Sequence, residues 1–391
     1  MNPPLPLEEA QSRLIDAASP LATERVAIEN AIGRFLAEPL VANRTQPWAD
    51  LSAMDGFATS GPGPWRIVGE SAAGHPFARA MANGEAARIS TGAAVPDGAD
   101  AILLVEDTAI DGAMVSAAAP PSAKHIRRRG FDFRSGDELL SAGVRIGPAQ
   151  LALGLAAGIE HCAVRRRPRV AILDTGDELA TSLDDPRPDA LPASNGPMLA
   201  AMIAGLADAE RVGPVPDDHA KLLAAFENAS DADVIVTTGG ASVGEHDLVR
   251  PVLEDWGARI DFWRVAIRPG KPLMIGRRGS QWIVGLPGNP ASAFVTAFLF
   301  VLPVLRRLGG ASADEASPKA LPAILADGVP AGGRRREFLR GIRKGATVVP
   351  IAERDSSALR ALAAADCLID RPANADALTA GAPVAVYPLD A

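Results

Sequence analysis

Apolar runs followed by glycine-rich turns recur three times in the middle of the chain. The segments RVAIL (169–173), VIVTT (234–238) and WIVGL (282–286) are rich in Val and Ile, which predicts buried strands. Helical spacing of apolar residues is found at 197–206, 219–229 and 248–256. Strands that alternate with helices predict a parallel α/β sheet, in which ligands bind beyond the carboxyl ends of the strands. We therefore expect the three turns to lie at one edge of this sheet.

The pattern on either side of this sheet predicts further domains. Residues 5–40 are predicted to be helical, because Leu5 to Ala18 follow helical spacing up to a stop at Pro20. Residues 51–107 alternate short strand-like runs with Gly/Pro turns, which favours a small β domain. Residues 148–160 predict a helix that flanks this β domain on its other side. Beyond a linker-like segment at 309–320, residues 321–391 contain short strands typical of a β barrel or sandwich.

One long apolar segment follows the third strand. Asn289, Pro290 and Ser292 are helix-start signals, and the apolar residues that follow continue to Leu308. Pro303 lies inside this segment and is expected to kink or end the helix, because proline lacks the backbone N–H.

Composition places the chain among soluble proteins. The 391 residues are 48% hydrophobic and 22% charged, which is an ordinary globular balance and enough for two to four domains. The start MNPPLPLEEA lacks a basic region followed by an apolar stretch, so no signal peptide is evident, and we expect no apolar run to reach the length and purity of a membrane span. Cys162 and Cys367 lie far apart and show no metal-binding spacing. We therefore expect a reduced, cytoplasmic protein with no membrane partner.

The net charge of −8 argues against a nucleic-acid partner, because neutralising phosphates needs a basic surface. Three local arginine runs still occur, at 127–129, 165–167 and 334–336. Each is either a solvated face or a contact at a domain junction.

The turn after the second strand, TTGGASVGEHD (237–247), favours phosphate binding. Gly239 and Gly240 allow backbone N–H groups to approach a ligand closely, and Ser242 adds a hydroxyl donor. Gly244 keeps the far wall open, and Asp247 is placed to hold a metal or orient a polar ligand at the rim. Taken alone, such a turn is as readily a loop without a ligand.

Eight motifs in order carry a resemblance to a known family. They are SAMDGFA (52–58), STGAAVPDGADAILLVED (90–107), RRRGFD (127–132), DTGDEL (174–179), TTGGASVGEHD (237–247), IRPGKP (267–272), GLPGNPAS (285–292) and REFLRG (336–341). Together they resemble the molybdopterin molybdenumtransferases, the MoeA family that includes the gephyrin E domain. The resemblance implies an elongated four-domain homodimer whose active cleft lies between the α/β domain of one subunit and the inserted β domain of the other. The implied reaction converts adenylylated molybdopterin and molybdate into the molybdenum cofactor and releases AMP.

The fold class implied is a multidomain α/β protein with a central sheet like that of MogA and MoaB, an inserted β domain, a helical N-terminal segment and a barrel-like C-terminal β domain. The expected boundaries are 1–44 with 134–167 for a helical and extended dimerisation domain, 45–133 for the inserted domain, 168–309 for the α/β domain and 317–391 for the C-terminal domain.

Site residues are implied by the same resemblance. The catalytic residues would be Asp55, Asp132, Glu178, Asp217 and Asp247. Of these, Glu178, Asp217 and Asp247 would hold Mg²⁺, whose preferred ligands are carboxylate oxygens. The substrate-binding residues would be Thr91, Arg127, Gly239, Gly240, Ser242, Gly244, Arg264, Arg268, Lys271, Pro287, Asn289, Pro290 and Arg340. Asp55 and Asp132 would reach the cleft from the β domain of the partner subunit, and Asp218 fits the pattern as well as Asp217 does.

The sequence departs from the family pattern at several positions. Arg264 and Arg268 replace lysines, and Phe57 replaces the usual tyrosine. In SSALRALAAADCLI (356–369), alanine occupies positions 361 and 363 where the family has serine, and Asp366 replaces asparagine. Two hydroxyl donors are lost and one negative charge is gained, which predicts weaker oxyanion binding or a changed role.

Three functional interpretations remain open. The first is the molybdenum-inserting enzyme, acting on molybdate or tungstate, with an adenylyltransferase as a possible partner protein. The second is another nucleotide-linked enzyme on the same α/β fold, an adenylyltransferase or pyrophosphatase, which explains TTGGASVG but not MDGFA. The third is a non-catalytic molybdopterin-binding scaffold or carrier, which the altered 356–369 segment favours and the retained Asp55, Glu178 and Asp247 oppose.

Overall fold

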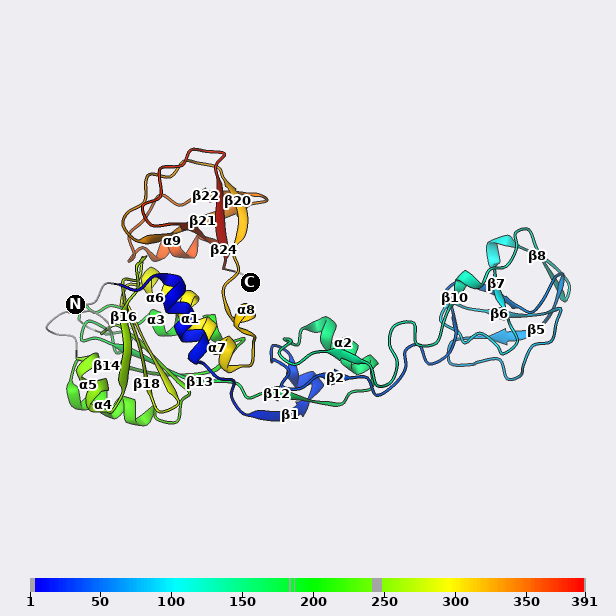
Figure 1. The fold of residues 1–391 in the computed structure, drawn as a ribbon, viewed down its shortest axis with the longest axis horizontal. Helices are drawn as coiled ribbons and strands as arrows, with labels where there is room; N and C mark the ends of the chain where they lie inside the picture. Colours follow the sequence, from blue (N-terminus) through cyan, green and yellow to red (C-terminus); the bar gives the residue numbers. More distant parts are fainter. Residues whose placement is uncertain (1–3, 183, 186, 241–247, 390–391) are drawn as a thin grey trace. The chain divides into compact units, whose positions relative to one another are not determined.

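The computed structural model describes residues 4–182, 184–185, 187–240 and 248–389. The chain divides into two compact units. The first contains Met1–Glu24, Gly33–Ala37 and Val164–Ala391, and the second contains Arg25–Ile32 and Glu38–Ala163. Each unit is described by itself below (Figure 1).

A six-stranded mixed sheet forms the centre of the first unit, in the order β14-β13-β15-β19-β18-β16. Its strands are β13 (Arg169–Thr175), β14 (Asp208–Val215), β15 (Val234–Thr238), β16 (Arg259–Arg264), β18 (Pro272–Arg278) and β19 (Gln281–Leu286). The three strands predicted from the sequence, β13, β15 and β19, are adjacent and parallel, with Val170, Val234 and Trp282 in register. The turns that follow them therefore meet at one edge, which confirms the expectation.

Two further strands of the sheet, which the sequence did not predict, are antiparallel. β18 runs antiparallel to β19, and β16 runs antiparallel to β18. The sequence of β18, PLMIGRR, follows the IRPGK turn and ends in two arginines, so its apolar part is too short to distinguish from a loop.

Helices cover both faces of this sheet. The predicted helical segments are confirmed as α3 (Asn195–Ile203), α4 (His219–Asn228) and α5 (Val249–Asp255). Successive β13 residues alternate between two buried clusters: Val170 and Ile172 pack in the cluster that includes α3, and Ala171 and Leu173 pack in the cluster that includes α4 and α5.

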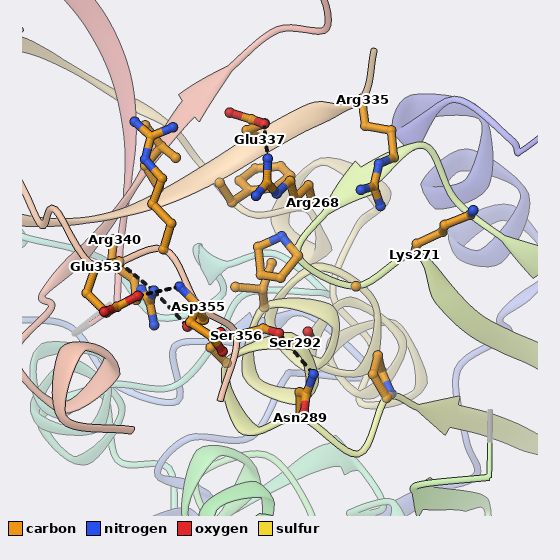
Figure 2. A pocket seen from close by; sticks show the side chains of 18 of the residues that line it. Arg268, Lys271, Asn289, Ser292, Arg335, Glu337, Arg340, Glu353, Asp355 and Ser356 are labelled. Carbon is orange, nitrogen blue, oxygen red and sulfur yellow. Dashed lines mark hydrogen bonds and ion pairs between the residues drawn. The ribbon is translucent and has the colours of Figure 1, made fainter. Parts of the chain in front are cut away.

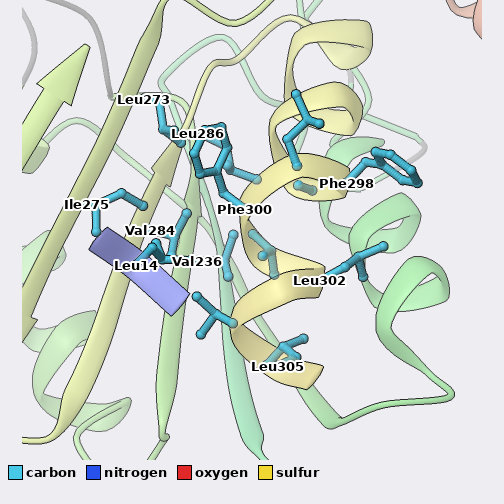
Figure 3. Close-up of a cluster of buried hydrophobic side chains, with 14 of the residues drawn as sticks. Leu14, Val236, Leu273, Ile275, Val284, Leu286, Phe298, Phe300, Leu302 and Leu305 are labelled. Carbon is cyan, nitrogen blue, oxygen red and sulfur yellow. The ribbon is translucent and has the colours of Figure 1, made fainter. Parts of the chain in front are cut away.

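The long apolar helix runs through Pro303 without ending there. It consists of α6 (Pro290–Thr296), a π-helical turn (Ala297–Val301) and α7 (Leu302–Leu308). A π turn directly before a proline relaxes the backbone where an N–H is missing, which explains why the helix continues. Figure 3 shows Phe300 and Leu305 of this helix facing Val236 and Val284 of the sheet.

This helix also corrects the expectation about apolar runs. Within the described residues, Pro290–Leu308 is long and apolar enough to cross a membrane by length and composition, but most of it is buried inside the protein. It is a core helix that packs beside α1 (Leu7–Ala17), whose Leu14 belongs to the same cluster (Figure 3).

The helical interpretation of residues 5–40 was correct only for α1. After Pro20 the chain forms β1 (Thr23–Ala27), a 3₁₀ turn (Ile28–Ala31) and β2 (Leu40–Val41). Thr23 and Val26 are β-branched and favour an extended strand over a helix. The segment 309–320, expected to be a linker, contains the short helix α8 (Ala313–Ala316), which begins with a capping box between Ser312 and Glu315.

The C-terminal part of the first unit is a closed barrel, as the sequence predicts. Its five strands are β20 (Leu321–Leu325), β21 (Arg336–Lys344), β22 (Thr347–Pro350), β23 (Cys367–Arg371) and β24 (Pro383–Pro388). β23 pairs with both β24 and β21, which closes the ring. A short strand, β17 (Ile267–Arg268), joins β21 in parallel and ties the barrel to the loops of the sheet.

The second unit contains a six-stranded sheet in the order β7-β4-β6-β5-β9-β8. Its strands are β4 (Gly56–Thr59), β5 (Trp65–Ser71), β6 (Glu85–Ile89), β7 (Ala101–Leu104), β8 (Thr108–Asp111) and β9 (Met114–Ala117). Smaller elements are β3 (Leu51–Ser52), β10 (Ile126–Arg127), β11 (Glu138–Leu140) and α2 (Pro148–Ala156), and β12 (His161–Arg165) has its first three residues in this unit. The predicted β domain and the helix near 148–160 are thus present, while the exact domain boundaries stay a prediction.

Candidate functional site

A pocket of 380 Å³ lies in the first unit, between the loops of the α/β sheet and the barrel. The sheet side contributes the loop after β17 and the loop between β19 and α6, and the barrel side contributes β21 and residues 351–356. Five predicted substrate-binding residues line this pocket: Arg268, Lys271, Pro287, Asn289 and Arg340. Figure 2 shows Arg268, Lys271, Asn289 and Arg340 around one hollow.

The charges that line the pocket favour an anionic ligand. Its cationic residues are Arg268, Lys271, Arg335, Arg340 and Arg354, and its acidic residues are Glu337, Glu353 and Asp355. Five positive charges against three negative ones leave an excess of two positive charges. A small dianion therefore fits the pocket electrostatically.

One pocket arginine is held by a buried carboxylate that the sequence analysis did not single out. Arg268 Nη1 lies 3.1 Å from Glu337 Oε1, and Glu337 is only 4% exposed. Lys271 is exposed, and no ion pair to it is found within the described residues. Glu337 belongs to the REFLRG motif, so its position was visible in the sequence, but its partner on β17 was not.

Arg340 organises a loop rather than facing solvent. Its guanidinium donates hydrogen bonds to the carbonyl oxygens of Glu353, Asp355 and Ala358 at 2.6, 3.0 and 3.2 Å. Burial lowers its pKa from the usual arginine value. These contacts shape the barrel-side wall of the pocket and give Arg340 a clear structural role.

The sheet side and the barrel side are joined by hydrogen bonds across the pocket floor. Asn289 Nδ2 donates to Ser356 Oγ at 3.0 Å (Figure 2). The Ala291 N–H donates to the Ser356 carbonyl at 3.0 Å. Ser356 was not predicted, although it opens the altered 356–369 segment.

The three departures in 356–369 occupy different environments. Ala361 is 9% exposed, on α9 (Leu359–Ala363), whereas Ala363 at the end of this helix is exposed. Asp366 accepts a hydrogen bond from the Arg343 N–H at 2.8 Å and so supports the barrel. Arg340 contacts the carbonyl of Ala358, the residue just before α9, and Ala361 is the third residue of this helix.

Close backbone packing shapes the glycine-rich edge of the sheet. Gly239 has φ +102°, and a Cβ there would lie 2.6 Å from the Thr175 carbonyl oxygen, so only glycine fits. Asn195 Nδ2 at the start of α3 donates to the Gly288 carbonyl at 2.7 Å. Gly239, Thr175 and Gly288 thus bring the three predicted turns together.

A buried carboxylate that the sequence analysis passed over holds this edge. Asp174 accepts hydrogen bonds from Thr238 Oγ1 at 2.7 Å and from the Gly196 N–H at 2.9 Å. Burial raises the pKa of Asp174. It connects β13, β15 and α3, and its signal in the sequence was its place as first residue of DTGDEL.

The structure distinguishes between the two neighbouring aspartates. Asp218 caps α4, since its side chain accepts a hydrogen bond from the Lys221 N–H at 2.9 Å. Asp217 instead lies beside Asp177 and Glu178. Burial raises the pKa of Asp217, and the negative charges of Asp177 and Glu178 add to this rise. This geometry supports Asp217 as the site residue.

Glu178 folds back over its own turn. Its Oε2 lies 2.3 Å from where a Cβ on Gly176 would be, so glycine at 176 makes room for the carboxylate. Among the residues that the structure describes, no group of three or more His, Cys, Asp or Glu is arranged to hold a metal. Ser242, Gly244 and Asp247 lie outside the described residues.

Because Asp217 is destabilised as an anion, Asp217→Asn should stabilise the folded protein at neutral pH. A raised folded-state pKa means that the charge costs free energy above that pKa, and the amide removes this cost. We expect the melting temperature at pH 7.5 to rise by about 1–2 °C. The gain should disappear as the pH falls below the ordinary aspartate pKa of about 3.9, because Asp217 is then protonated in both the folded and the unfolded parent protein. A melting temperature that falls at pH 7.5 would contradict the assigned environment.

Two of the predicted residues of the second unit, Asp55 and Thr91, contact each other. Asp55 accepts hydrogen bonds from the Thr91 N–H at 2.6 Å and from Thr91 Oγ1 at 3.0 Å, and these bonds lower the pKa of Asp55. Arg127 on β10 pairs in register with Leu51 on β3, four residues before Asp55. Asp132 follows on the loop that leaves β10, where its N–H donates to the Gln46 carbonyl.

The remaining predicted residues are less close to the pocket. Arg264 ends β16, where its carbonyl accepts a hydrogen bond from the Leu5 N–H, and it does not line the pocket. Pro290 is the first residue of α6, and Gly240 has φ +64° beside Gly239.

The arginine runs differ in their contacts. Arg166 forms two hydrogen bonds with Asp233, and Arg167 pairs with Asp208, so the 165–167 run is structural. Arg336 contacts Asp370 and Glu8, whereas Arg335 lines the pocket.

Comparison with known proteins agrees with this geometry. Family models match residues 5–158 as the MoeA N-terminal region (domain I and II), 171–307 as a probable molybdopterin binding domain and 322–389 as the MoeA C-terminal region (domain IV). A molybdopterin molybdenumtransferase of Haemophilus influenzae is 33% identical over 86% of this chain and 85% of its own length. The chain belongs to the molybdopterin molybdenumtransferase family.

Other members of this family support the assignment along the whole chain. The molybdopterin molybdenumtransferase of Nostoc is 35% identical over 82% of this chain and 77% of its own length. The crystal structure of a molybdopterin biosynthesis MoeA protein from Pyrococcus horikoshii matches with a TM-score of 0.85 at 25% identity, covering 99% of this chain and 100% of the other. The multidomain fold and the transferase class expected from the motifs are therefore confirmed.

Proposed function

We propose that this protein transfers molybdenum from molybdate to adenylylated molybdopterin and releases AMP. Membership of the molybdopterin molybdenumtransferase family supports this reaction. The single structural observation that carries it is the 380 Å³ pocket with an excess of two positive charges, lined by loops of both the sheet and the barrel. Molybdate is a small dianion, and the pocket matches its charge.

We assign molybdate and the phosphates of the pterin substrate to two neighbouring binding sites in the first unit. Molybdate would bind in the pocket at Lys271 and Arg268, which present cationic N–H donors. The phosphates of the pterin substrate would bind at the glycine-rich edge beside Gly239, where backbone N–H groups can approach closely. The IRPGKP and GLPGNP loops lie next to each other on the pocket wall and would connect the two places.

The acidic group at the sheet edge suits a divalent cation. Asp217 carries a raised pKa beside Asp177 and Glu178, and a cation would relieve this repulsion. Glu178 and Asp217, with Asp247 by family resemblance, would hold Mg²⁺, which would offset the negative charge of the leaving AMP phosphate. The chain's own contribution is to orient the phosphates and hold the oxyanion.

The finer properties of the protein are part of this proposal. We expect a cytoplasmic homodimer in which Asp55, Thr91, Arg127 and Asp132 act from the second unit of the partner subunit, with an adenylyltransferase as a possible supplier of substrate. The scaffold alternative and the nucleotide-linked alternative gain no support from the comparisons or from the geometry.

The reaction is tested by mixing the purified full chain with adenylylated molybdopterin, Mg²⁺ and either molybdate or tungstate. AMP release that depends on the oxyanion is the expected result. The two oxyanions separately report which metal the site uses. AMP release without either oxyanion would favour a pyrophosphatase, and no release would favour the scaffold.

Restoring serine at Ala361 tests the altered 356–369 segment. If Ala361 lies at the oxyanion site, Ala361→Ser adds a donor, and a hydrogen bond to a charged group contributes about 1.5–3 kcal/mol. The molybdate concentration for half-maximal AMP release should then fall about tenfold. Ala364→Ser is the matched control, because Ala364 is exposed at the end of the same helix and is not one of the departures from the family pattern. Identical molybdate curves for the parent and Ala361→Ser would mean that position 361 does not serve the anion.

A further inference from the structure

Two aromatic side chains of the second unit are strongly exposed. Trp48 is 59% exposed and Phe131 is 76% exposed. Burial of aromatic side chains is among the largest contributions to folding and binding, so two neighbouring exposed rings indicate a surface that meets a ligand.

The two rings belong to loops that are held side by side. The Gly130 N–H donates to the Pro47 carbonyl at 3.0 Å, and the N–H groups of Asp132 and Phe133 donate to the Gln46 carbonyl at 3.1 and 3.2 Å. Trp48 and Phe131 are each one residue away from the Gly130–Pro47 hydrogen bond. The backbone therefore fixes both aromatic residues on one small patch.

The charges around this patch favour an anionic ligand. Arg128 is engaged with Asp50 at 2.6 Å, and the Arg129 N–H donates to the same carboxylate at 2.8 Å. The guanidinium groups of Arg127 and Arg129 are exposed, and the described part of the chain offers them no ion-pair partner. Two exposed arginines thus lie within four residues of Phe131, against one further exposed carboxylate, Asp132.

We propose that Trp48 and Phe131 form a stacking platform for a planar nitrogen heterocycle of a phosphorylated ligand, with Arg127 and Arg129 facing its phosphate. Aromatic rings stack on any base because every base presents a π face, and arginine adds an attraction to phosphate. This inference rests on the proposed function, since adenylylated molybdopterin carries two such heterocycles, the pterin and the adenine. The platform assigns one of them to the second unit.

The patch also continues toward predicted site residues. Trp48 is three residues before Leu51, which pairs with Arg127, and Asp132 directly follows Phe131. A ligand stacked on the platform would therefore extend its phosphate along β10 and its reacting end toward Asp132. This continuity favours a substrate over an unrelated partner protein as the occupant.

The test measures binding of two probes, AMP and 6-hydroxymethylpterin, to the full chain by titration calorimetry. Trp48→Leu and Phe131→Leu keep an apolar side chain but remove the aromatic ring, and each should weaken binding of at least one probe by about fivefold or more. Trp48→Phe restores a ring and should recover most of the affinity. Ile110→Leu is the matched control, because Ile110 is a 50% exposed apolar residue on β8 of the same unit.

Comparing the affinities for AMP and 6-hydroxymethylpterin shows whether adenine or the pterin stacks on the platform. Measuring AMP release as well tests the platform and the proposed reaction separately. In AMP-release assays the two leucine variants should raise the KM for adenylylated molybdopterin while kcat stays near the parent value. This is expected because stacking stabilises the bound substrate and the transition state equally. Parent-like affinity for both probes in both variants overturns the platform, even if the parent enzyme turns over normally. A change in sedimentation with unchanged probe affinity also overturns it, because a second copy of the chain would then be the occupant. Absence of turnover in the parent, with ring-dependent probe binding retained, contradicts the reaction but not the platform.

Discussion

Replacing Glu178 by alanine is expected to lower oxyanion-dependent AMP release by about 100-fold or more, the loss typical when one preorganised electrostatic group is removed. Glu178 is exposed and folds back over Gly176, so its carboxylate contributes little to the hydrophobic core. It lies beside Asp217, whose pKa is raised in part by the negative charge of Glu178. Loss of Glu178 should therefore also raise the Mg²⁺ concentration needed for half-maximal activity.

Two controls make this result specific to the acidic group. Asp184→Ala removes another exposed carboxylate from the same loop and should leave turnover unchanged. The melting temperature of Glu178→Ala should match that of the parent within about 1 °C, because surface substitutions have small effects on stability. Parent-like AMP release by Glu178→Ala would remove this carboxylate from the site.

The sequence could predict the parts of the fold that local patterns determine. β13, β15 and β19 are continuous runs of β-branched and apolar residues, so their burial and their common edge followed from the residues alone. The closed C-terminal barrel was predicted from three of its strands, β20, β22 and β24. β21 carries charged residues at both ends and was visible only as part of the REFLRG motif.

The features that the sequence could not predict depend on partners far away in the chain. Glu337 reads as an ordinary polar residue of a strand until Arg268, on β17, is placed beside it. Asp217 and Asp218 are equivalent in sequence, and only the hydrogen bond from Lys221 to Asp218 identifies the helix cap. Arg340 was expected to bind substrate, and its three carbonyl partners come from residues 353–358, which form no regular pattern.

These contacts between residues far apart in the sequence also determine which pocket cations are available to an anion. Arg268 is balanced by Glu337, and Arg340 is committed to the carbonyls of the barrel loop. Among the described residues, Lys271 and Arg354 are the exposed pocket cations with no ion pair, and Arg335 donates a hydrogen bond to the Ile267 carbonyl. Lys271 lies on the same loop as Arg268, so oxyanion binding should depend on Lys271 more than the number of lining arginines suggests.

Lys271→Ala is accordingly expected to raise the molybdate concentration for half-maximal AMP release by about tenfold or more, with little change in the maximal rate. A hydrogen bond to a charged group contributes about 1.5–3 kcal/mol, and each 1.4 kcal/mol corresponds to a factor of ten. Lys271→Arg keeps the charge and should retain most of the affinity. Lys221→Ala, which removes an exposed lysine from α4, is the matched control.

The opposite change in charge provides the decisive comparison. Glu337→Gln removes one negative charge from the pocket and releases Arg268 from its ion pair, so it should lower the half-maximal molybdate concentration. The two variants shift the pocket charge by one unit in opposite directions, and higher ionic strength should reduce both effects. If Lys271→Ala and Glu337→Gln both give molybdate curves that coincide with the parent curve, then the oxyanion binds outside this pocket, because a charge change of either sign beside the bound dianion must alter its affinity.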